Sequence, residues 1–428
     1  MLNDWKFTTL GAEADLISGF PFRSNKYTDD PRDVRLLRGD NIVQGNIRWV
    51  NAKRWSIEDA PNFEQYELKK DDVVLAMDRP WIDAGLKYAA IDNDDLPCLL
   101  LQRTTRLRGG PNLDIRFLRY VIGSPEFTKH IQSITTGSLV PHISSRQIKD
   151  FVFRLPPLAT QERIAAVLSA LDAKIALNHQ INTELEGMAK LLYDYWFVQY
   201  DFPLSAAQAA ALGQPRLIGQ PYRSSGGPMV FDPQLKREIP KGWEVGNLLD
   251  IATFTNGIAC QKFPATSAEH LRVIKIKEMH SGFTETSEKV TTDVPEKVIV
   301  RDGDILFSWS ASLEVMIWTG GTGALNQHIF KVTSENYPRS ICYFTLKGYL
   351  QHFKMMADQR KTTMGHITRE HLEQSRIAIP PKEIGNEFES ITEPIFAQII
   401  NNHQQNQELT TLRDWLLPML MNGQVRVG

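Results

Sequence analysis

Two long stretches of the chain place apolar residues with the spacing of a helix that packs along one side. In the first, residues 155–200, apolar residues recur every three or four positions over roughly four heptads. The stretch opens on Pro156-Pro157 and contains no later proline, so it predicts one long helix. The positions that form its predicted seam are Ile164, Leu168, Leu171, Ile175, Asn178, Asn182 and Leu185.

The second stretch, residues 379–428, repeats the first at a constant offset. Pro156-Pro157 recurs 224 positions later as Pro380-Pro381. Pro394 departs from the repeat and predicts a kink in the second helix or a later start. The seam positions of this helix are Ile395, Ile399, Asn402, Asn406 and Leu409.

Asparagines occupy equivalent places in both seams. A buried asparagine weakens a coiled coil but fixes its register, so its partner is expected to offer a matching amide. We therefore expect the two helices to pack on each other as an antiparallel coiled coil with an internal pseudo-twofold repeat. Such a pair would hold two globular domains apart at a set distance, a geometry suited to duplex DNA.

The repeat extends to the rest of the chain with an offset that falls from 238 to 224. Short apolar runs in both copies predict strands, and between them lie Gly-, Asn- and Asp-containing loops. The fold class is therefore α/β (α+β), with one domain present twice. The matched residues are Trp5 with Trp243, Gly19 with Gly257, Arg35 with Arg272, Asp72 with Asp304, Leu101 with Leu325, and His142 with His366.

These patterns divide the chain into five segments. Two mixed domains are each followed by a long helix, and a segment rich in Pro, Gly, Ser and Ala joins the copies as an irregular crossing, with a short helical turn at AAQAAAL. The predicted segments are a first domain at 1–154, a helix at 155–200, the connector at 201–241, a second domain at 242–378 and a helix at 379–428.

Composition narrows the class of protein. The chain has 428 residues, 42% hydrophobic and 23% charged, as in an ordinary globular protein. Cys98, Cys260 and Cys342 are far apart and none has a CxxC partner, so neither a disulfide framework nor a zinc cluster is expected. No secretory signal or membrane-spanning run is visible, so the cytoplasm is the expected location. The net charge of −2 means that contact with nucleic acid needs local clusters or a partner.

Polar loop residues are the candidates for such contact. Arg, Lys, Gln and Asn can pair with base edges, and Ser and Thr can hold phosphates. Each residue alone is more often solvated surface, but they cluster in the loops that differ most between the copies, which favours recognition of two different half-sites. The first-copy candidates are Arg23, Ser24, Asn25, Lys26, Arg79, Trp81, Gln102, Arg103, Thr136, Ser138, His142 and Arg146. The second-copy candidates are Gln261, Lys262, Ser308, Trp309, Asn326, Gln327, His328, Lys361, Thr362, Thr363 and His366.

Catalytic and metal signatures are missing from the sequence. It contains no GxxxxGK[ST], GxGxxG after a strand, HExxH or GxSxG motif, and its proline pairs lack the flanking residues of an amino-methyltransferase site. His366 and His371 are five residues apart, which is not the spacing of a shared metal. A structural role for His142 and His366 therefore stays open beside the DNA-binding one. The rival functions are a protein–protein scaffold on a helical stalk and a self-contained DNA adenine methyltransferase.

The chain resembles the specificity subunits of type I restriction-modification enzymes over almost its full length. The resemblance rests on the paired LPPLATQERI…LDAKI and IPPKEIGNEF…FAQII segments, their GSLVPHISSRQIKD and TTMGHITREHLEQ lead-ins, and the connector YRSSGGPMVFDPQLKREIPKGWEVGNL. The second copy of the chain differs from the motif LPPLxEQ that usually opens the long helix in this family, because it has Gly385-Asn386-Glu387 there.

The resemblance implies a non-catalytic subunit. Two target recognition domains would each read one half of a bipartite double-stranded DNA sequence, and the antiparallel helices would act as a ruler. Two methyltransferase subunits would dock on this framework, on outer faces that include Arg163 and Lys174, and would use S-adenosylmethionine to modify adenine N6. Restriction (motor) subunits would join them for cleavage. No cofactor or metal is expected in this chain.

Overall fold

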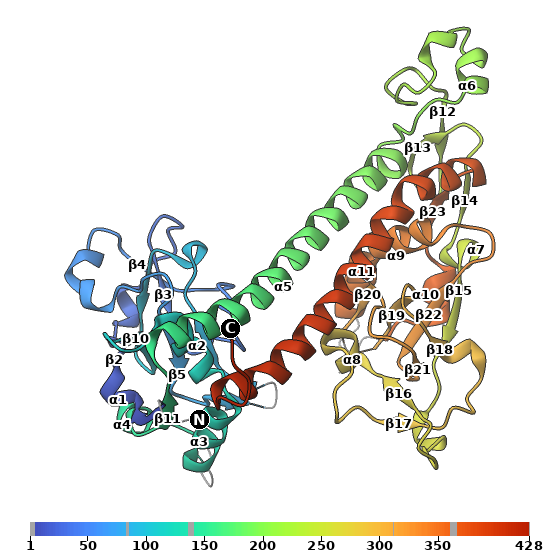
Figure 1. Ribbon diagram of the computed structural model, residues 1–428. Helices are drawn as coiled ribbons and strands as arrows, with labels where there is room; N and C mark the ends of the chain where they lie inside the picture. Colours follow the sequence, from blue (N-terminus) through green and yellow to red (C-terminus); the bar gives the residue numbers. More distant parts are fainter. Residues whose placement is uncertain (1–4, 83–84, 136–140, 311, 360–365, 428) are drawn as a thin grey trace. The chain divides into compact units, whose positions relative to one another are not determined.

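The computed structural model describes residues 5–82, 85–135, 141–310, 312–359 and 366–427. The chain forms two compact units. Unit 1 comprises residues 1–175 and 408–428, and unit 2 comprises residues 176–407. The long helices α5 (Leu158–Tyr193) and α11 (Lys382–Met421) each contribute one part to unit 1 and the other part to unit 2 (Figure 1).

Both predicted long helices are confirmed. Each begins within two residues of its proline pair, because prolines are tolerated at the start of a helix and not in its interior. The alternative of a late start at Pro394 is wrong, because α11 already begins at Lys382. Pro394 is exposed, so water can reach the carbonyl of Ser390 that lacks its helical donor.

Within unit 2 the two helices run antiparallel and meet through buried amides. The Asn178 Nδ2 donates to Asn406 Oδ1 at 2.9 Å, and the Asn402 Nδ2 donates to Asn182 Oδ1 at 2.7 Å. Asn402 and Asn406 are the repeat counterparts of Asn178 and Asn182. The two hydrogen bonds are therefore images of each other under a local twofold relation between the helices. The predicted matching amides are confirmed.

Within unit 1 the same helices are joined by charge. The Arg413 Nη1 donates to Asp172 Oδ1 at 3.0 Å, and the Tyr120 hydroxyl donates to Asp172 Oδ2 at 2.8 Å. Ile164 and Leu168 are fully buried in the core of this unit. The remaining apolar seam residues are half-buried, namely Leu171, Ile175, Leu185, Ile395, Ile399 and Leu409.

Unit 1 is built on a four-stranded antiparallel sheet with the order β2-β10-β5-β8. Its strands are β2 (Ala14–Ser18), β5 (Val73–Ala76), β8 (Tyr88–Ala90) and β10 (Thr104–Gly109). A three-stranded sheet β4-β3-β9 consists of β3 (Val34–Leu37), β4 (Arg54–Trp55) and β9 (Cys98–Leu100). Two further pairs join β1 (Lys6–Thr9) to β11 (Val152–Leu155) and β6 (Trp81–Ile82) to β7 (Gly85–Leu86).

Short helices lie between the strands of unit 1. Residues 115–135 form two helices, because Gly123 ends the first and Pro125 opens the second. Asp114 caps the first helix by accepting from the Arg116 and Phe117 amides at 2.9 Å. The short helices of the unit are α1 (Leu10–Glu13), η1 (Ser24–Lys26), η2 (Ala60–Tyr66), η3 (Asn93–Asp95), α2 (Ile115–Ile122), α3 (Pro125–Thr135) and α4 (Ser145–Lys149).

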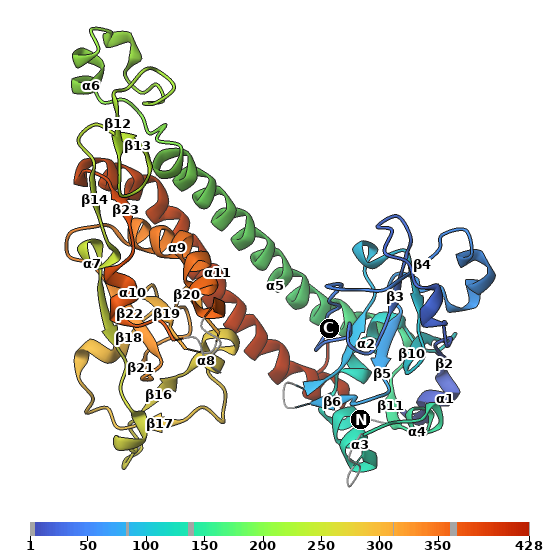
Figure 2. The ribbon, with the colours of Figure 1, turned by 180° about the vertical axis from the view of Figure 1, so that it is seen from behind.

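Unit 2 repeats this plan (Figure 2). Its antiparallel sheet, in the order β15-β22-β19-β20, consists of β15 (Thr253–Asn256), β19 (Ile305–Ser308), β20 (Glu314–Ile317) and β22 (Ile329–Thr333). A second sheet consists of β16 (Leu271–Ile274), β17 (Lys289–Val290), β18 (Ile299–Val300) and β21 (Gly323–Leu325). The other elements are β14 (Glu244–Gly246), α7 (Leu248–Ile251), η6 (Cys260–Lys262), α8 (Ile276–Ser281), η7 (Glu296–Val298), α9 (Arg339–Gln359), α10 (Arg369–Glu373) and β23 (Ile377–Ile379).

Strand register tests the residue matches made from sequence. The parallel pair β3–β9 places Arg35 opposite Cys98, and β16–β21 places Arg272 opposite Gly323. The two registers are equivalent when Arg35 is matched with Arg272, as the sequence predicts. The match of Leu101 with Leu325 is wrong by one residue: Cys98 corresponds to Gly323, so Leu101 corresponds to Asn326.

Two equivalent glycines support the corrected match. A Cβ on Gly19 would lie 2.1 Å from the Leu101 carbonyl oxygen, and one on Gly257 would lie 2.2 Å from the Asn326 carbonyl oxygen. Only glycine allows the backbone to approach so closely. The same contact is therefore made at the same point of both units.

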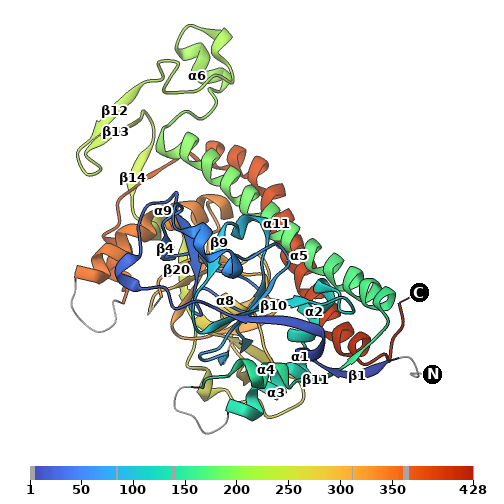
Figure 3. The same ribbon diagram turned by 90° about the vertical axis from the view of Figure 1, so that its left-hand side faces the viewer.

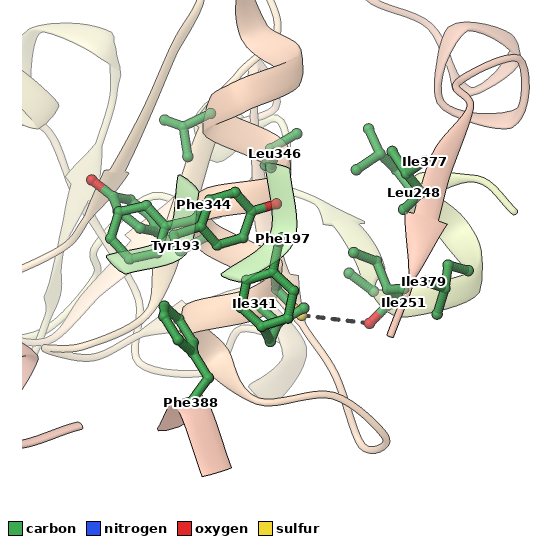
Figure 4. Close-up of a cluster of buried hydrophobic side chains, with 14 of the residues drawn as sticks. Tyr193, Phe197, Leu248, Ile251, Ile341, Phe344, Leu346, Ile377, Ile379 and Phe388 are labelled. Atoms are coloured by element: carbon green, nitrogen blue, oxygen red, sulfur yellow. Dashed lines mark hydrogen bonds between the residues drawn. The ribbon is translucent and has the colours of Figure 1, made fainter. Parts of the chain in front are cut away.

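In unit 2, the ends of both long helices share one core with the sheet. The Phe388 ring in α11 is fully buried and lies 5.0 Å from that of Phe197, just after α5 (Figure 4). The Tyr193 ring lies 5.4 Å from Phe344 in α9. Tyr193, Trp196, Phe197 and Tyr200 are buried and pack at the end of α5, whereas Tyr195 is exposed. A π-helical turn at Asp194–Val198 continues α5 and contains the buried Trp196 and Phe197.

The connector is more regular than expected. It forms the predicted helical turn, α6 (Ala206–Ala211), followed by a short 3₁₀ turn, η5 (Pro215–Leu217), and an antiparallel hairpin of β12 (Met229–Asp232) and β13 (Arg237–Pro240) (Figure 3). The prediction of an irregular crossing is wrong for the hairpin. Its strands are short and it contains prolines, so the composition of this segment predicted a loop and no strands.

No helix in the described part of the chain combines the length and apolar character needed to cross a membrane.

The crossed amides predict that a single substitution lowers the free energy of unfolding more than the matching double substitution does. Asn178→Leu alone deprives the buried Asn406 of this donor and is expected to lower the free energy of unfolding by about 1–3 kcal/mol. The double change Asn178→Leu/Asn406→Leu replaces the pair by apolar contact and is expected to restore most of that loss. Urea unfolding of both variants measures this. Equal losses in the single and double variants would contradict it.

Candidate nucleic-acid interface and helical spacer

Three chain segments of unit 1 meet where β5 ends. The Met77 amide donates to the Arg103 carbonyl at 2.9 Å, and the Ile143 amide donates to the Met77 carbonyl at 2.9 Å. These backbone bonds place Asp78, Arg103 and His142 next to one another. We call this meeting point the unit 1 junction.

At this junction the Asp78 carboxylate holds two exposed side chains. The Arg103 Nη1 donates to Asp78 Oδ2 at 2.8 Å, and His142 Nδ1 lies 2.6 Å from Asp78 Oδ1. The Arg103 side chain is 70% exposed. Partial burial raises the pKa of Asp78, but the His142 hydrogen bond and the charge of Arg103 outweigh it and lower the pKa overall. Asp78 is therefore ionised at neutral pH, and Arg103 is fixed while it still faces solvent.

The unit 1 junction borders an open cleft of about 820 Å³. Cations exceed carboxylates along its lining, which suits an anionic ligand. Burial, and then the charge of Arg79, lower the pKa of Lys87, while Asp40 acts in the opposite direction. The basic lining residues are Arg38, Lys53, Arg79, Lys87 and Arg103, and the acidic ones are Asp29, Asp40 and Asp78.

Unit 2 contains the corresponding junction with different side chains. The Trp309 amide donates to the His328 carbonyl at 3.3 Å, and the Ile367 amide donates to the Trp309 carbonyl at 3.0 Å. This is the bonding pattern of the unit 1 junction, with Trp309 in the place of Met77. The Trp309 ring lies 5.5 Å from both the His328 and the His366 rings, and its Nε1 donates to Asn256 Oδ1 at 3.0 Å. An aromatic group replaces the ion pair.

Most predicted contact residues that the structure describes are accessible. Trp81, Trp309, Gln327 and His328 are half-buried. The exposed candidates are Arg23, Ser24, Asn25, Lys26, Arg79, Gln102, Arg103, His142 and Arg146 in unit 1, and Gln261, Lys262 and His366 in unit 2. Five candidates lie outside the described residues, namely Thr136, Ser138, Lys361, Thr362 and Thr363.

Two candidates are corrected. Ser308 is fully buried, and its hydroxyl donates to the Ser312 carbonyl and accepts from the Glu314 amide, so it closes a strand end and is not available to a ligand. Asn326 is also buried, beside Cys260. It is the unit 2 counterpart of Leu101 in the corrected match. In the described part of the chain, no group of three or more His, Cys, Asp or Glu side chains is placed to hold a metal ion.

The chain matches known proteins along most of its length. Residues 4–187 and 240–411 match the family model described as the type I restriction modification DNA specificity domain. The chain belongs to this family of type I specificity subunits.

Individual relatives agree with that membership. The chain is 25% identical to the type I restriction enzyme HindI specificity subunit of Haemophilus influenzae, over 99% of this chain and all of the relative. It is 26% identical to the MjaIX specificity subunit of Methanocaldococcus jannaschii, over 73% of this chain and 69% of the relative. The fold is similar to the crystal structure of the S subunit from M. genitalium, with a TM-score of 0.56 at 12% identity, covering 97% of this chain and 96% of that one. The chain is thus the DNA specificity component of a type I restriction-modification system and not its catalytic component.

The sequence of this specificity subunit did not identify Asp78 and Asn256 as candidate site residues. Both are polar residues that hold predicted contact residues, Arg103 and Trp309. A search for cations and amides that bind DNA passes over the Asp78 carboxylate, which repels phosphate, and nothing in the local sequence distinguishes Asn256 from other asparagines. The available signal was position, because Asp78 directly precedes Arg79 at the end of a strand.

Two equivalent histidines face each other beside the amide pairs of unit 2. The His179 and His403 rings lie 6.2 Å apart. Burial, and then the neighbouring His179, lower the pKa of His403, while Glu186 acts in the opposite direction. The folded state therefore disfavours a proton on His403.

This shift predicts a helix pair that weakens in mild acid. Because the pKa of His403 is depressed on folding, the unfolded chain takes up its proton first as the pH falls below about 6.5, and stability is lost until the folded pKa is passed. We expect a lower free energy of unfolding at pH 5.5 than at pH 7.5, with a smaller difference in His403→Gln. Urea unfolding at both pH values measures this. An unchanged difference in His403→Gln would contradict it.

Proposed function

We propose that the domains at residues 1–154 and 242–378 each read one half of a bipartite sequence in double-stranded DNA. The observation that carries this proposal is the shared junction. The same backbone bonds present Arg103 and His142 in one unit, and His328 and His366 in the other. A common framework with different exposed polar groups is what two readers of different half-sites require.

Charge supports a division of labour with partner proteins. The chain carries a net charge of −2, although cations line the unit 1 cleft. Phosphate neutralisation supplies much of the affinity for DNA. We infer that the partner subunits supply most of it and that this chain supplies the sequence choice.

The helix pair is proposed to act as the spacer between the two readers. α5 alone has 36 residues and thus a length of about 54 Å. The crossed amides oppose sliding of one helix along the other, because a shift would leave buried polar groups unpaired. A spacer of fixed register would set a fixed gap between half-sites.

Exposed apolar residues on both helices support docking of two identical partners. Met188 and Leu191 in α5 are 60% and 71% exposed, and Leu412 and Trp415 in α11 are 42% and 55% exposed. The second pair lies 224 positions after the first, so the repeat carries the same apolar surface twice. Exposed apolar residues that adjoin one another can form part of an interaction site, and here the same two positions recur in both copies.

We infer that one methyltransferase subunit binds each of these surfaces, and that the exposed faces of the helices, including the Arg163 and Lys174 side, take part in the docking. S-adenosylmethionine would be bound by those subunits, which would methylate adenine N6, and restriction subunits would complete the system. The cytoplasm, where the chromosome is accessible, is the proposed location.

The experiment that tests the function is methylation by a reconstituted complex. The chain is combined with its system's methyltransferase subunits, and modified adenines are mapped in a genome-length DNA by sequencing. One split sequence with a constant gap is expected. Modification without a split sequence, or by the methyltransferase subunits alone at the same sites, would refute the proposal.

Shortening the spacer is expected to shorten the gap. Residues 176–182 and 402–408 face each other and contain both members of each amide pair. Their joint deletion removes about 10.5 Å of helix, or about three base pairs of DNA. The same sequencing measures the new gap. Asn178→Leu/Asn406→Leu, which keeps the helix length, is the control, and an unchanged gap in the deletion variant would exclude the ruler role.

Each docking surface is expected to hold one partner. Leu191→Asp and Trp415→Asp should each reduce the bound methyltransferase from two copies to one, because a carboxylate would be buried at the contact. Native mass spectrometry counts the copies. Ile218→Asp, at an equally exposed apolar residue of the connector, is the control and should keep both. Two copies retained by Leu191→Asp/Trp415→Asp would contradict this assignment.

A further inference from the structure

We propose that Asp78 is a positioning residue that aims Arg103 at a guanine in the first half-site. The inference rests on the proposed function and adds to it one residue pair, one base and one half-site. It concerns the unit 1 junction alone, because unit 2 has no ion pair at the corresponding place in its described residues.

The geometry leaves the reading edge of Arg103 free. Asp78 occupies Nη1 at 2.8 Å, so the Nη2 and Nε hydrogens remain available in the plane of the guanidinium. Two parallel donors match the O6 and N7 acceptors of guanine, the commonest specific contact of arginine in the major groove. The backbone of Arg103 adds to the constraint, because its φ of +65° lies in the left-handed region, which few residues adopt.

The carboxylate argues for a base and against a phosphate. An ionised Asp78 so close to Arg103 would repel a phosphate brought to the same guanidinium, whereas the guanine edge is neutral. Arg79 and Lys87 in the same cleft are better placed for phosphates, since no carboxylate of the described residues lies within ion-pair distance of either. The cleft thus separates positioning contacts from a reading contact.

His142 completes the support. Its Nδ1 engages the second oxygen of Asp78 at 2.6 Å, so both carboxylate oxygens are used and the group cannot rotate freely. In unit 2 the corresponding positions carry Ser310, His328 and His366, and the pair of bidentate donors is missing. The strict requirement for guanine is therefore confined to the first half-site.

The test uses the reconstituted complex and a library of bipartite sites randomised at every base of both halves. Arg103→Lys keeps the charge but loses the paired donors, and is expected to reduce the preference for guanine at one position about tenfold. Asp78→Ala and Asp78→Asn should relax the same position, with the smaller effect in Asp78→Asn because the amide still offers an acceptor. The preferences in the other half-site, and the thermal midpoint, should stay as in the wild type.

Asp30→Asn is the matched control. It removes the carboxylate charge from an exposed arginine–carboxylate pair in the same domain, with Arg32 at 2.7 Å, as Asp78→Asn does at the junction, and it should leave every base preference unchanged. Three results would overturn the proposal while the proposed function stands: no change at any position, a uniform loss of affinity for all sequences, or a change in Arg103→Lys without one in Asp78→Ala. A wild-type complex that modifies no split sequence would instead refute the proposed function, and the inference with it.

Discussion

The structure depends on two crossed amide hydrogen bonds between α5 and α11. Burying four asparagine side chains in a helical seam is costly unless they find each other, and in this register they do. The Oδ1 of Asn178 is buried without a partner among the described groups, so the arrangement costs stability even when formed. An apolar seam would bind more tightly and slide more easily. The amides lower the stability of the helix pair but fix its register, and a spacer depends on the register more than on the stability.

The two copies have kept their backbone bonds and changed their side chains. In unit 1 the contact of α2 with the long helices uses Tyr120, Asp172 and Arg413. In unit 2 the counterpart of Asp172 is Phe396, whose ring lies 5.6 Å from Tyr343. A charged network and an aromatic cluster thus support the same joint. Such divergence is possible because backbone hydrogen bonds do not depend on side-chain identity.

The sequence predicts the helices and most strands, because each is encoded locally. Prolines mark both helix starts, and the asparagines identify their own partners through the repeat. The corrected match of Leu101 with Asn326 could not be found that way, since a one-residue difference in a loop leaves both local patterns intact. The burial of Ser308 was equally hidden, because its hydroxyl bonds to a carbonyl four residues later in a turn that only the folded chain forms. The ion pair between Asp78 and Arg103 joins residues that are 25 positions apart. The local sequence around either residue does not show that the two meet in the folded chain.

The shared junctions also bear on how new specificities arise. Met77 and Trp309 hold their neighbours through amide and carbonyl groups that every amino acid has. Exchange of the exposed side chains in one copy therefore leaves the scaffold of that copy, and all of the other copy, in place. Under the proposed function, the two halves can therefore vary independently, and the number of possible targets is the product of the numbers of variants of the two domains.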